Sequence, residues 1–168
     1  RSELAGRQML VVLDNASSAS QVRPLLPASS GCLTVVTSRD SLTGLVARDG
    51  ARRIKLGVLE SDDAINLLAQ ITGPARVGSE AQACRDLVRL CGNLPLAVRI
   101  AAAQLAEQPD RTVADQVQQL STDRLGGLDI DGDEAGSMRA VFDPSYAALP
   151  GDRQRVFRLL GLASGPDR

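Results

Sequence analysis

Two apolar runs of this sequence end on side chains that could do chemistry. Residues 9–13 are apolar and are followed at once by Asp14, while the run "CLTVVTSR" ends on Thr37, Ser38 and Arg39. A carboxylate just beyond a buried strand can direct Mg²⁺ to a bound phosphate, because ligands bind beyond the carboxyl ends of parallel strands. The same carboxylate could instead cap the turn that follows it. The arginine could reach a terminal phosphate, or it could lie solvated on a loop.

A third candidate is the stretch "GNLPLA" at residues 92–97. Gly92 is suited to close one helix, and Pro95 to open the next in its first turn, where a missing N–H costs nothing. Helix punctuation is a sufficient physical explanation of these two residues.

The elements that must position these residues begin with a βαβ unit. We expect strands at 9–13, 32–39 and 52–59, with short helices after an N-cap at Ser18 or Ser20 and over 41–48. The first two apolar runs predict strands that are buried on both faces and joined by a right-handed crossover in a parallel sheet.

From Ser61 onward the apolar spacing becomes helical. "SDDAINLLAQI" begins with Ser61 as a predicted N-cap and carries two acids in its first turn, where they favour the helix dipole. "TGPARVGS" is expected to interrupt the helices. Further helices are expected over 79–91, 94–107 and 112–120, and in "MRAVFDPSYAAL" and "GDRQRVFRLLGLAS". The sequence therefore predicts an α/β start and an all-helical remainder, with a boundary near residue 60.

Composition excludes several classes of function. The 168 residues contain no His, which removes imidazole catalysis and imidazole metal ligation. The net charge is −1 and basic residues do not cluster, so we expect no direct binding of nucleic acid by this segment. No apolar run reaches the ~20 residues that span a membrane. The three cysteines form no C-x-x-C pair, and Cys84 and Cys91 share a helix face, which favours reduced core thiols in a cytoplasmic protein.

The order of several motifs carries a family resemblance. "LVVLDNA", "QVRPLLP", "LTVVTSR", "CGNLPLAVRIAA" and "SYAALPGDRQRVFRLLGL" follow one another along nearly the whole chain. Together they resemble the NB-ARC nucleotide-binding domain of STAND-type signalling NTPases, in the version found in bacterial AfsR/SARP-type transcriptional regulators. The ordered set is far more specific than any one of its members.

The resemblance implies a role for each matching residue. Asp14 corresponds to the Walker B acid that directs Mg²⁺, which would answer the first question in favour of the metal. Arg39 corresponds to the sensor arginine that reads the γ-phosphate of ATP, and Thr37, in the same T-S-R segment, is also expected to bind the nucleotide. Pro95 corresponds to the proline of the family's G-x-P motif, which packs against adenine in the ADP-bound form, and Gly92 is also expected to bind the nucleotide. The implied cofactors are ADP or ATP with Mg²⁺.

Two departures from the family pattern limit the implied activity. Asn15 stands where many relatives have a second acid that polarises the attacking water, so no catalytic residue is assigned. The sequence also contains no G-x-x-x-x-G-K-[ST] loop, whose backbone amides and lysine cradle the phosphates. In the family this loop precedes the Walker B strand, so we expect the chain to begin after it. Alone, the chain is then expected neither to bind ATP tightly nor to hydrolyse it.

The expected organisation follows from these assignments. Residues 1–59 would be the C-terminal half of the nucleotide-binding α/β domain, 60–122 a first helical subdomain, 123–136 a linker and 137–168 the start of a winged-helix subdomain. The implied partners are nucleotide, other domains of a longer signal-transduction protein, and a second copy through apolar surface left exposed on the sheet. The alternative is a non-catalytic helical interaction scaffold. A hydrolase of another chemistry is disfavoured because the chain has no nucleophile elbow.

Overall fold

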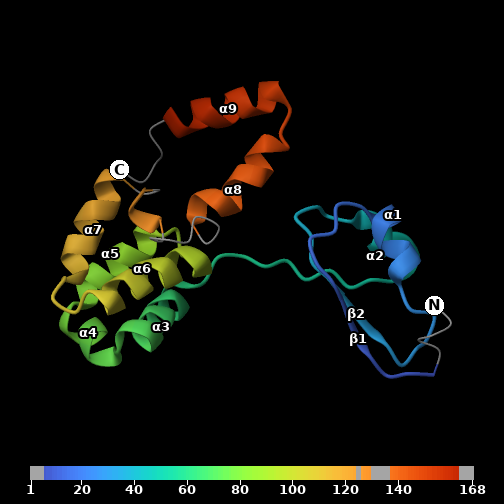
Figure 1. Cartoon of the computed structure of the whole chain (residues 1–168), viewed down its shortest axis with the longest axis horizontal. Helices are drawn as coiled ribbons and strands as arrows, with labels where there is room; N and C mark the ends of the chain where they lie inside the picture. Colours follow the sequence, from blue (N-terminus) through green and yellow to red (C-terminus); the bar gives the residue numbers. More distant parts are fainter. Residues whose placement is uncertain (1–5, 124–125, 130–136, 163–168) are drawn as a thin grey trace. The chain divides into compact units, whose positions relative to one another are not determined.

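The computed structural model of the chain describes residues 6–123, 126–129 and 137–162, and it divides into two units (Figure 1). Unit 1 spans residues 1–56 and unit 2 spans residues 57–168. Unit 1 holds a small parallel sheet with helices, and the described part of unit 2 is helical. This agrees with the expectation of an α/β part followed by a helical part. The four finer domain ranges stay predictions.

Unit 1 is a βαβ unit followed by a helix. Its elements are β1 (Leu10–Leu13), α1 (Ala19–Val22), the 3₁₀ turn η2 (Arg23–Leu25), β2 (Leu33–Val36) and α2 (Thr43–Asp49). The strands are parallel, and Leu13 lies opposite Val36 in their register. The Ser18 hydroxyl accepts a hydrogen bond from the Gln21 N–H at 3.2 Å, which confirms the predicted N-cap of α1.

One face of this sheet is covered and the other is bare. The small core consists of Ala16, Val22 and Leu45, with Leu13 and Val36 packed against it. On the other face Leu10, Val12, Leu33 and Val35 are all exposed, Leu10 by 61% and Leu33 by 66%. The prediction of strands buried on both faces is therefore wrong. Helices α1 and α2 contribute to the same core, and none of the described residues covers the second face.

The third predicted strand, over 52–59, is also wrong. Residues 51–60 form neither strand nor helix, and the described sheet consists of β1 and β2. Ile54, Leu56 and Val58 in this segment are exposed, Leu56 by 89%. Alternating apolar residues predict which face a strand would bury, but a strand forms only where a neighbour pairs with it. None of the described residues of unit 1 pairs with this segment as a neighbouring strand.

Unit 2 is a succession of helices. They are α3 (Ser61–Thr72), α4 (Pro74–Ser79), α5 (Ala81–Leu90), α6 (Pro95–Glu107), α7 (Val113–Thr122), the 3₁₀ turn η3 (Gly126–Leu128), α8 (Met138–Ala147) and α9 (Gly151–Leu162). Helix α3 takes Glu60 as its N-cap, so Ser61 is the first helical residue rather than the predicted cap. Helix α4 replaces the predicted interruption, because Pro74 sits at its first turn and starts the helix.

The core of unit 2 lies between α3, α5, α6 and α7. Helix α3 packs against α6, and α5 packs against α7. The buried apolar residues of α6 are Ala97, Val98, Ile100, Ala101, Ala102 and Leu105. Cys84 and Cys91 are buried in the same core as free thiols, which confirms their predicted place. Burial raises the pKa of both thiols, that of Cys91 to about 12.

Two charged side chains satisfy helix ends inside unit 2. The Arg76 guanidinium donates to the carbonyl oxygen of Leu105 at 2.6 Å, near the end of α6. A carboxylate oxygen of Glu80 accepts from the backbone N–H groups of Val113 at 2.9 Å and Ala114 at 3.3 Å. These N–H groups open α7 and have no partner within their own helix. Long-range capping therefore ties α4 and α5 to the ends of α6 and α7.

Helices α8 and α9 form a hairpin at the end of unit 2 (Figure 1). The rings of Tyr146 and Phe157 lie 5.7 Å apart between their centroids, and the Gln154 side-chain amide donates to the carbonyl oxygen of Tyr146 at 3.1 Å. Both helices were predicted, but a winged helix at 137–168 stays a prediction. Most of the predicted linker at 123–136 lies outside the described residues.

Candidate functional site

The parallel register of unit 1 places the two predicted strand ends side by side. Because Leu13 pairs with Val36, the next residues, Asp14 and Thr37, lie next to each other at the carboxyl edge of the sheet. The Thr37 N–H donates to the carbonyl oxygen of Leu13 at 3.0 Å, which extends the ladder to this point. The structure therefore brings together the first two groups of candidate residues.

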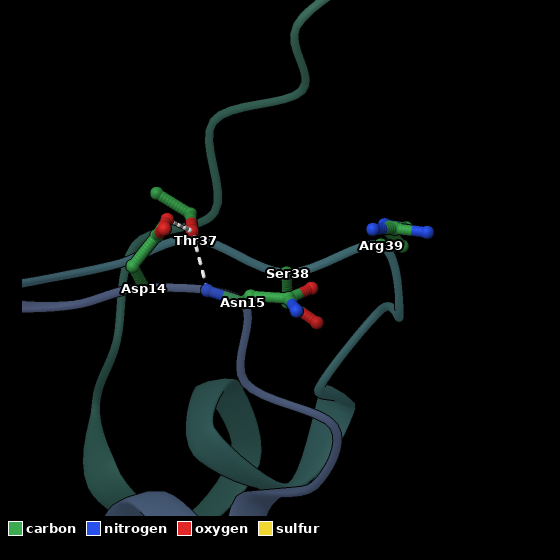
Figure 2. Close-up of a pocket in the computed structure, with 5 residues that line it drawn as sticks. All are labelled: Asp14, Asn15, Thr37, Ser38 and Arg39. Atoms are coloured by element: carbon green, nitrogen blue, oxygen red, sulfur yellow. Dashed lines mark hydrogen bonds between the residues drawn. The ribbon is translucent and has the colours of Figure 1, made fainter. Parts of the chain in front are cut away.

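Hydrogen bonds then fasten the two strand ends to each other. The Thr37 hydroxyl donates to a carboxylate oxygen of Asp14 and accepts from the Asn15 N–H at 2.8 Å (Figure 2). The Ala16 N–H donates to the carbonyl oxygen of Thr37 at 2.9 Å. The Ser38 hydroxyl donates to the carbonyl oxygen of Ala16 at 2.6 Å. This network fixes the backbone on both sides of Asp14.

The chain turns sharply after Asp14. Asn15 has a φ of 54°, in the left-handed region that Asn tolerates better than most residues with a side chain. Ala16 follows and is buried in the small core of unit 1. The turn lets β1 end at the sheet edge, after which the chain leads through the buried Ala16 to α1. The structure thus gives Asn15 a conformational role that its sequence position did not reveal.

A pocket of about 410 Å³ lies at this edge, lined by Asp14, Asn15, Thr37, Ser38 and Arg39. Figure 2 shows the side chains of Asp14 and Thr37 facing each other, with Arg39 farther along the chain, beyond Ser38. Asp14 and Arg39 are both exposed. The pocket therefore offers one acidic and one basic side chain to an incoming ligand.

These residues fit a hydrated Mg²⁺ that also binds phosphate. Magnesium commonly takes one or two carboxylates and completes its octahedron with water and phosphate oxygens. A carboxylate has about four lone-pair sites, so the bond from Thr37 leaves Asp14 able to accept further bonds. No group of three or more acidic or cysteine residues that could hold a metal occurs among the described residues. The donor set therefore suits a metal shared with a ligand better than one held by protein alone.

The other predicted ligand residues, Gly92 and Pro95, belong to unit 2 and have clear structural roles. Gly92 has a φ of 61° and ends α5 in a Schellman motif, in which the Asn93 N–H donates to the Val88 carbonyl oxygen at 3.0 Å. Pro95 is the first residue of α6 and is exposed. The helix punctuation expected from the sequence is confirmed.

Ser38 was noted at the strand end from the sequence but was given no role in the site. Its hydroxyl accepts from the Asp40 N–H at 2.9 Å in addition to donating to Ala16, so it shapes the turn that presents Arg39. A serine hydroxyl can bond the backbone two residues further on, which makes serine a common turn residue. That signal was present in "TSRD" and could have been used.

The chain is similar to known regulatory proteins over nearly its whole length. It is 43% identical to the regulatory protein AfsR of Streptomyces griseus and 46% identical to that of Streptomyces coelicolor, over 99% of this chain in both cases. It is 27% identical over 97% of its length to the disease resistance protein RPP8 of Arabidopsis thaliana. The matched regions are 17%, 16% and 19% of these relatives, so the chain spans less than a fifth of each. No family model matches the chain.

The similarity establishes homology, and the helix lengths bear separately on membrane crossing. The chain is homologous to a segment of AfsR regulatory proteins, and more distantly to plant disease resistance proteins. None of the helices in the described ranges is both long and apolar enough to cross a lipid bilayer.

Proposed function

We propose that this chain is part of an ADP/ATP-dependent switch of the NB-ARC type within a longer, AfsR-like regulator of transcription. The observation that carries the proposal is that Asp14 and Arg39 both line one pocket, at the carboxyl edge of a parallel sheet. Asp14 would direct a hydrated Mg²⁺ to the phosphates, and Arg39 would register the γ-phosphate. The similarity to AfsR proteins supports the regulatory context.

Other parts of the proposal come from the family resemblance. Pro95, exposed at the start of α6, would pack against adenine. The phosphate-cradling loop would lie upstream in the longer protein, so this chain alone would bind nucleotide weakly and would not hydrolyse it. Mg²⁺ supplies charge neutralisation of the phosphates when it is bound. The residues of this chain orient it and read the phosphate chain.

The test is calorimetry with ADP and with Mg-ATP on this chain and on a chain extended upstream through a G-x-x-x-x-G-K-[ST] loop. The proposal expects binding by the extended chain only. Binding by neither would overturn the switch and favour a scaffold. Low-micromolar binding by the short chain would refute the predicted need for the upstream loop.

Single variants of the extended chain assign the roles within the pocket. Asp14→Ala should abolish the Mg²⁺ dependence of nucleotide affinity, and Asp40→Ala, which removes a nearby carboxylate outside the pocket lining, should not. Arg39→Ala should weaken ATP about tenfold relative to ADP, because a charge-assisted bond to the terminal phosphate is lost. Arg48→Ala, which removes an exposed arginine of α2, is the matched control. Equal loss for ATP and ADP would refute the sensing role.

A helical interaction scaffold is the second candidate, and α9 favours it. None of the residues of α9 is buried, and Val156, Phe157, Leu159 and Leu160 are all exposed. Exposed apolar surface of this kind marks interaction sites. Asp14→Ala distinguishes the two candidates, since a scaffold should bind its partners unchanged.

The exposed sheet face of unit 1 supports the proposed self-association. Sedimentation velocity across a concentration series would detect it.

A further inference from the structure

We infer that Thr37 is a positioning residue, whose hydroxyl orients the Asp14 carboxylate, rather than a residue that contacts the nucleotide. The inference rests on the proposed function for the role of Asp14, and it assigns Thr37 differently from the family resemblance. It follows from how the bonding capacity of the Thr37 hydroxyl is used.

A threonine hydroxyl has one hydrogen to donate and two lone pairs that accept. In unit 1 the hydrogen goes to Asp14, and one lone pair takes the Asn15 N–H at 2.8 Å. Phosphate oxygens of a metal-bound nucleotide accept hydrogen bonds. Thr37 could donate to a phosphate only by releasing Asp14. The two roles are therefore mutually exclusive at any moment.

The backbone of Thr37 is held so that its hydroxyl meets Asp14. Its N–H donates to the Leu13 carbonyl oxygen at 3.0 Å, and its carbonyl oxygen accepts from the Ala16 N–H at 2.9 Å. These two bonds lie on either side of Asp14, which follows the last residue of β1. The left-handed Asn15, at a φ of 54°, turns its own N–H to the Thr37 hydroxyl. Thr37 is thus bonded to the residues on either side of Asp14 as well as to Asp14 itself.

This arrangement lets the segment after β2, which also includes Arg39, orient the carboxylate that would direct the metal. Partners that hydrogen-bond to a metal-directing carboxylate fix its orientation, and their removal weakens metal binding. With one oxygen fixed by Thr37, the carboxylate keeps acceptor capacity for a hydrated Mg²⁺. The metal-directing carboxylate would then be held by the segment that leads to Arg39, in the same pocket lining.

Three substitutions of Thr37 and one control substitution test this arrangement. Thr37→Val removes the hydroxyl at nearly constant shape, and Thr37→Ser retains it. Thr43→Val makes the same chemical change in α2, outside the pocket lining, and is the matched control. Thr37→Ala removes the same hydroxyl with a smaller side chain and must reproduce the effects of Thr37→Val.

The first measurement is amide hydrogen exchange by NMR on this chain without nucleotide. Thr37→Val should speed exchange of the Asn15 N–H roughly fivefold, since its acceptor is lost. Exchange of the Ala16 N–H should not change, because its acceptor is the backbone oxygen of Thr37. Thr37→Ser and Thr43→Val should match the unsubstituted chain. Unchanged Asn15 exchange in Thr37→Val would overturn the inference.

The second measurement is the affinity of the extended chain for a fluorescent ATP analogue, taken over a series of Mg²⁺ concentrations. Its result is the Mg²⁺ concentration at which half of the change in affinity has occurred. Thr37→Val should raise it about tenfold and leave affinity in EDTA unchanged, while Thr37→Ser should restore it. An equal loss of affinity with and without Mg²⁺ would show a direct nucleotide contact and overturn the inference. A chain without Mg²⁺-dependent affinity would refute the proposed function, and the exchange result would still decide whether Thr37 holds Asp14.

Discussion

Replacing Gly92 by alanine should destabilise unit 2 for a purely conformational reason. Gly92 ends α5 with a φ of 61°, and a Cβ built there would meet no atom within 4 Å. Steric clash is thus excluded, and only the left-handed backbone opposes a side chain. Gly78 offers a matched control in the same unit. It lies within α4, has no positive φ, and a Cβ there would also meet nothing within 4 Å.

The two substitutions should act in opposite directions. A left-handed L-residue costs about 1–2 kcal/mol, and the loss of glycine's freedom in the unfolded chain returns about 0.4–1 kcal/mol. Gly92→Ala should therefore lower the free energy of unfolding by about 1 kcal/mol. Gly78→Ala should raise it by up to about 1 kcal/mol, because alanine is the better helix former. The variants should differ by about 2 kcal/mol.

Urea unfolding followed by circular dichroism at 222 nm reports on the helices, most of which lie in unit 2. We expect the midpoint to fall in Gly92→Ala and to rise in Gly78→Ala, with unchanged slopes. In thermal unfolding, each change should correspond to a shift of about 4 °C. Shifts of the same sign would refute the conformational argument. Unchanged stability with lost nucleotide affinity would instead show that Gly92 acts on the ligand.

Three further predictions concern two helix caps of unit 2 and the cysteine thiols of the chain. Glu80→Ala should cost about 1–2 kcal/mol in unfolding experiments, since two N–H groups that open α7 lose their acceptor, and Glu80→Gln should cost less because it retains one. Hydrogen bonds from the Thr112 side chain and then its backbone N–H lower the pKa of Asp115. The stability that this carboxylate contributes is complete above its ordinary pKa of 3.8 and is lost as the pH falls through the lower folded value, so Asp115→Asn should flatten acid unfolding curves below about pH 4. Ellman's reagent should label the half-buried Cys32 in the native chain, and Cys84 and Cys91 only after denaturation, because burial raises the pKa of both thiols and keeps them protonated.

Local signals predicted the elements of this fold well. The apolar runs that end on Asp14 and Thr37 became strands, and Gly92 and Pro95 ended and opened the helices expected of them. These features depend on residues within one turn or one strand of each other. The burial of the strands was predicted wrongly because it depends on which elements cover each face. Helix α4 was missed because a Gly-Pro pair such as Gly73 and Pro74 is equally typical of a break between helices and of the start of a helix.

The position of the candidate residues at one sheet edge was predictable from the sequence, but their hydrogen bonding was not. The sequence placed Asp14 and Arg39 at strand ends, and the parallel arrangement brought those ends to one edge. Which hydroxyl meets the carboxylate depends on register, and a shift of one residue would have moved Thr37 to the other face. The left-handed conformation of Asn15 depends in turn on the bond that its N–H makes across the strands.

Under the proposed function, the strand edge would hold a metal and a phosphate rather than turn over the nucleotide. A general base must take up a proton from water, which a carboxylate at Asn15 could do and a neutral amide cannot. Asn15 adopts the left-handed backbone conformation that the turn requires. Its N–H donates to the Thr37 hydroxyl and so helps to hold that hydroxyl against Asp14. The residue that weakens the case for hydrolysis thus strengthens the orientation of the metal-directing acid. A slow or absent hydrolysis step would leave the proposed switch governed by nucleotide exchange.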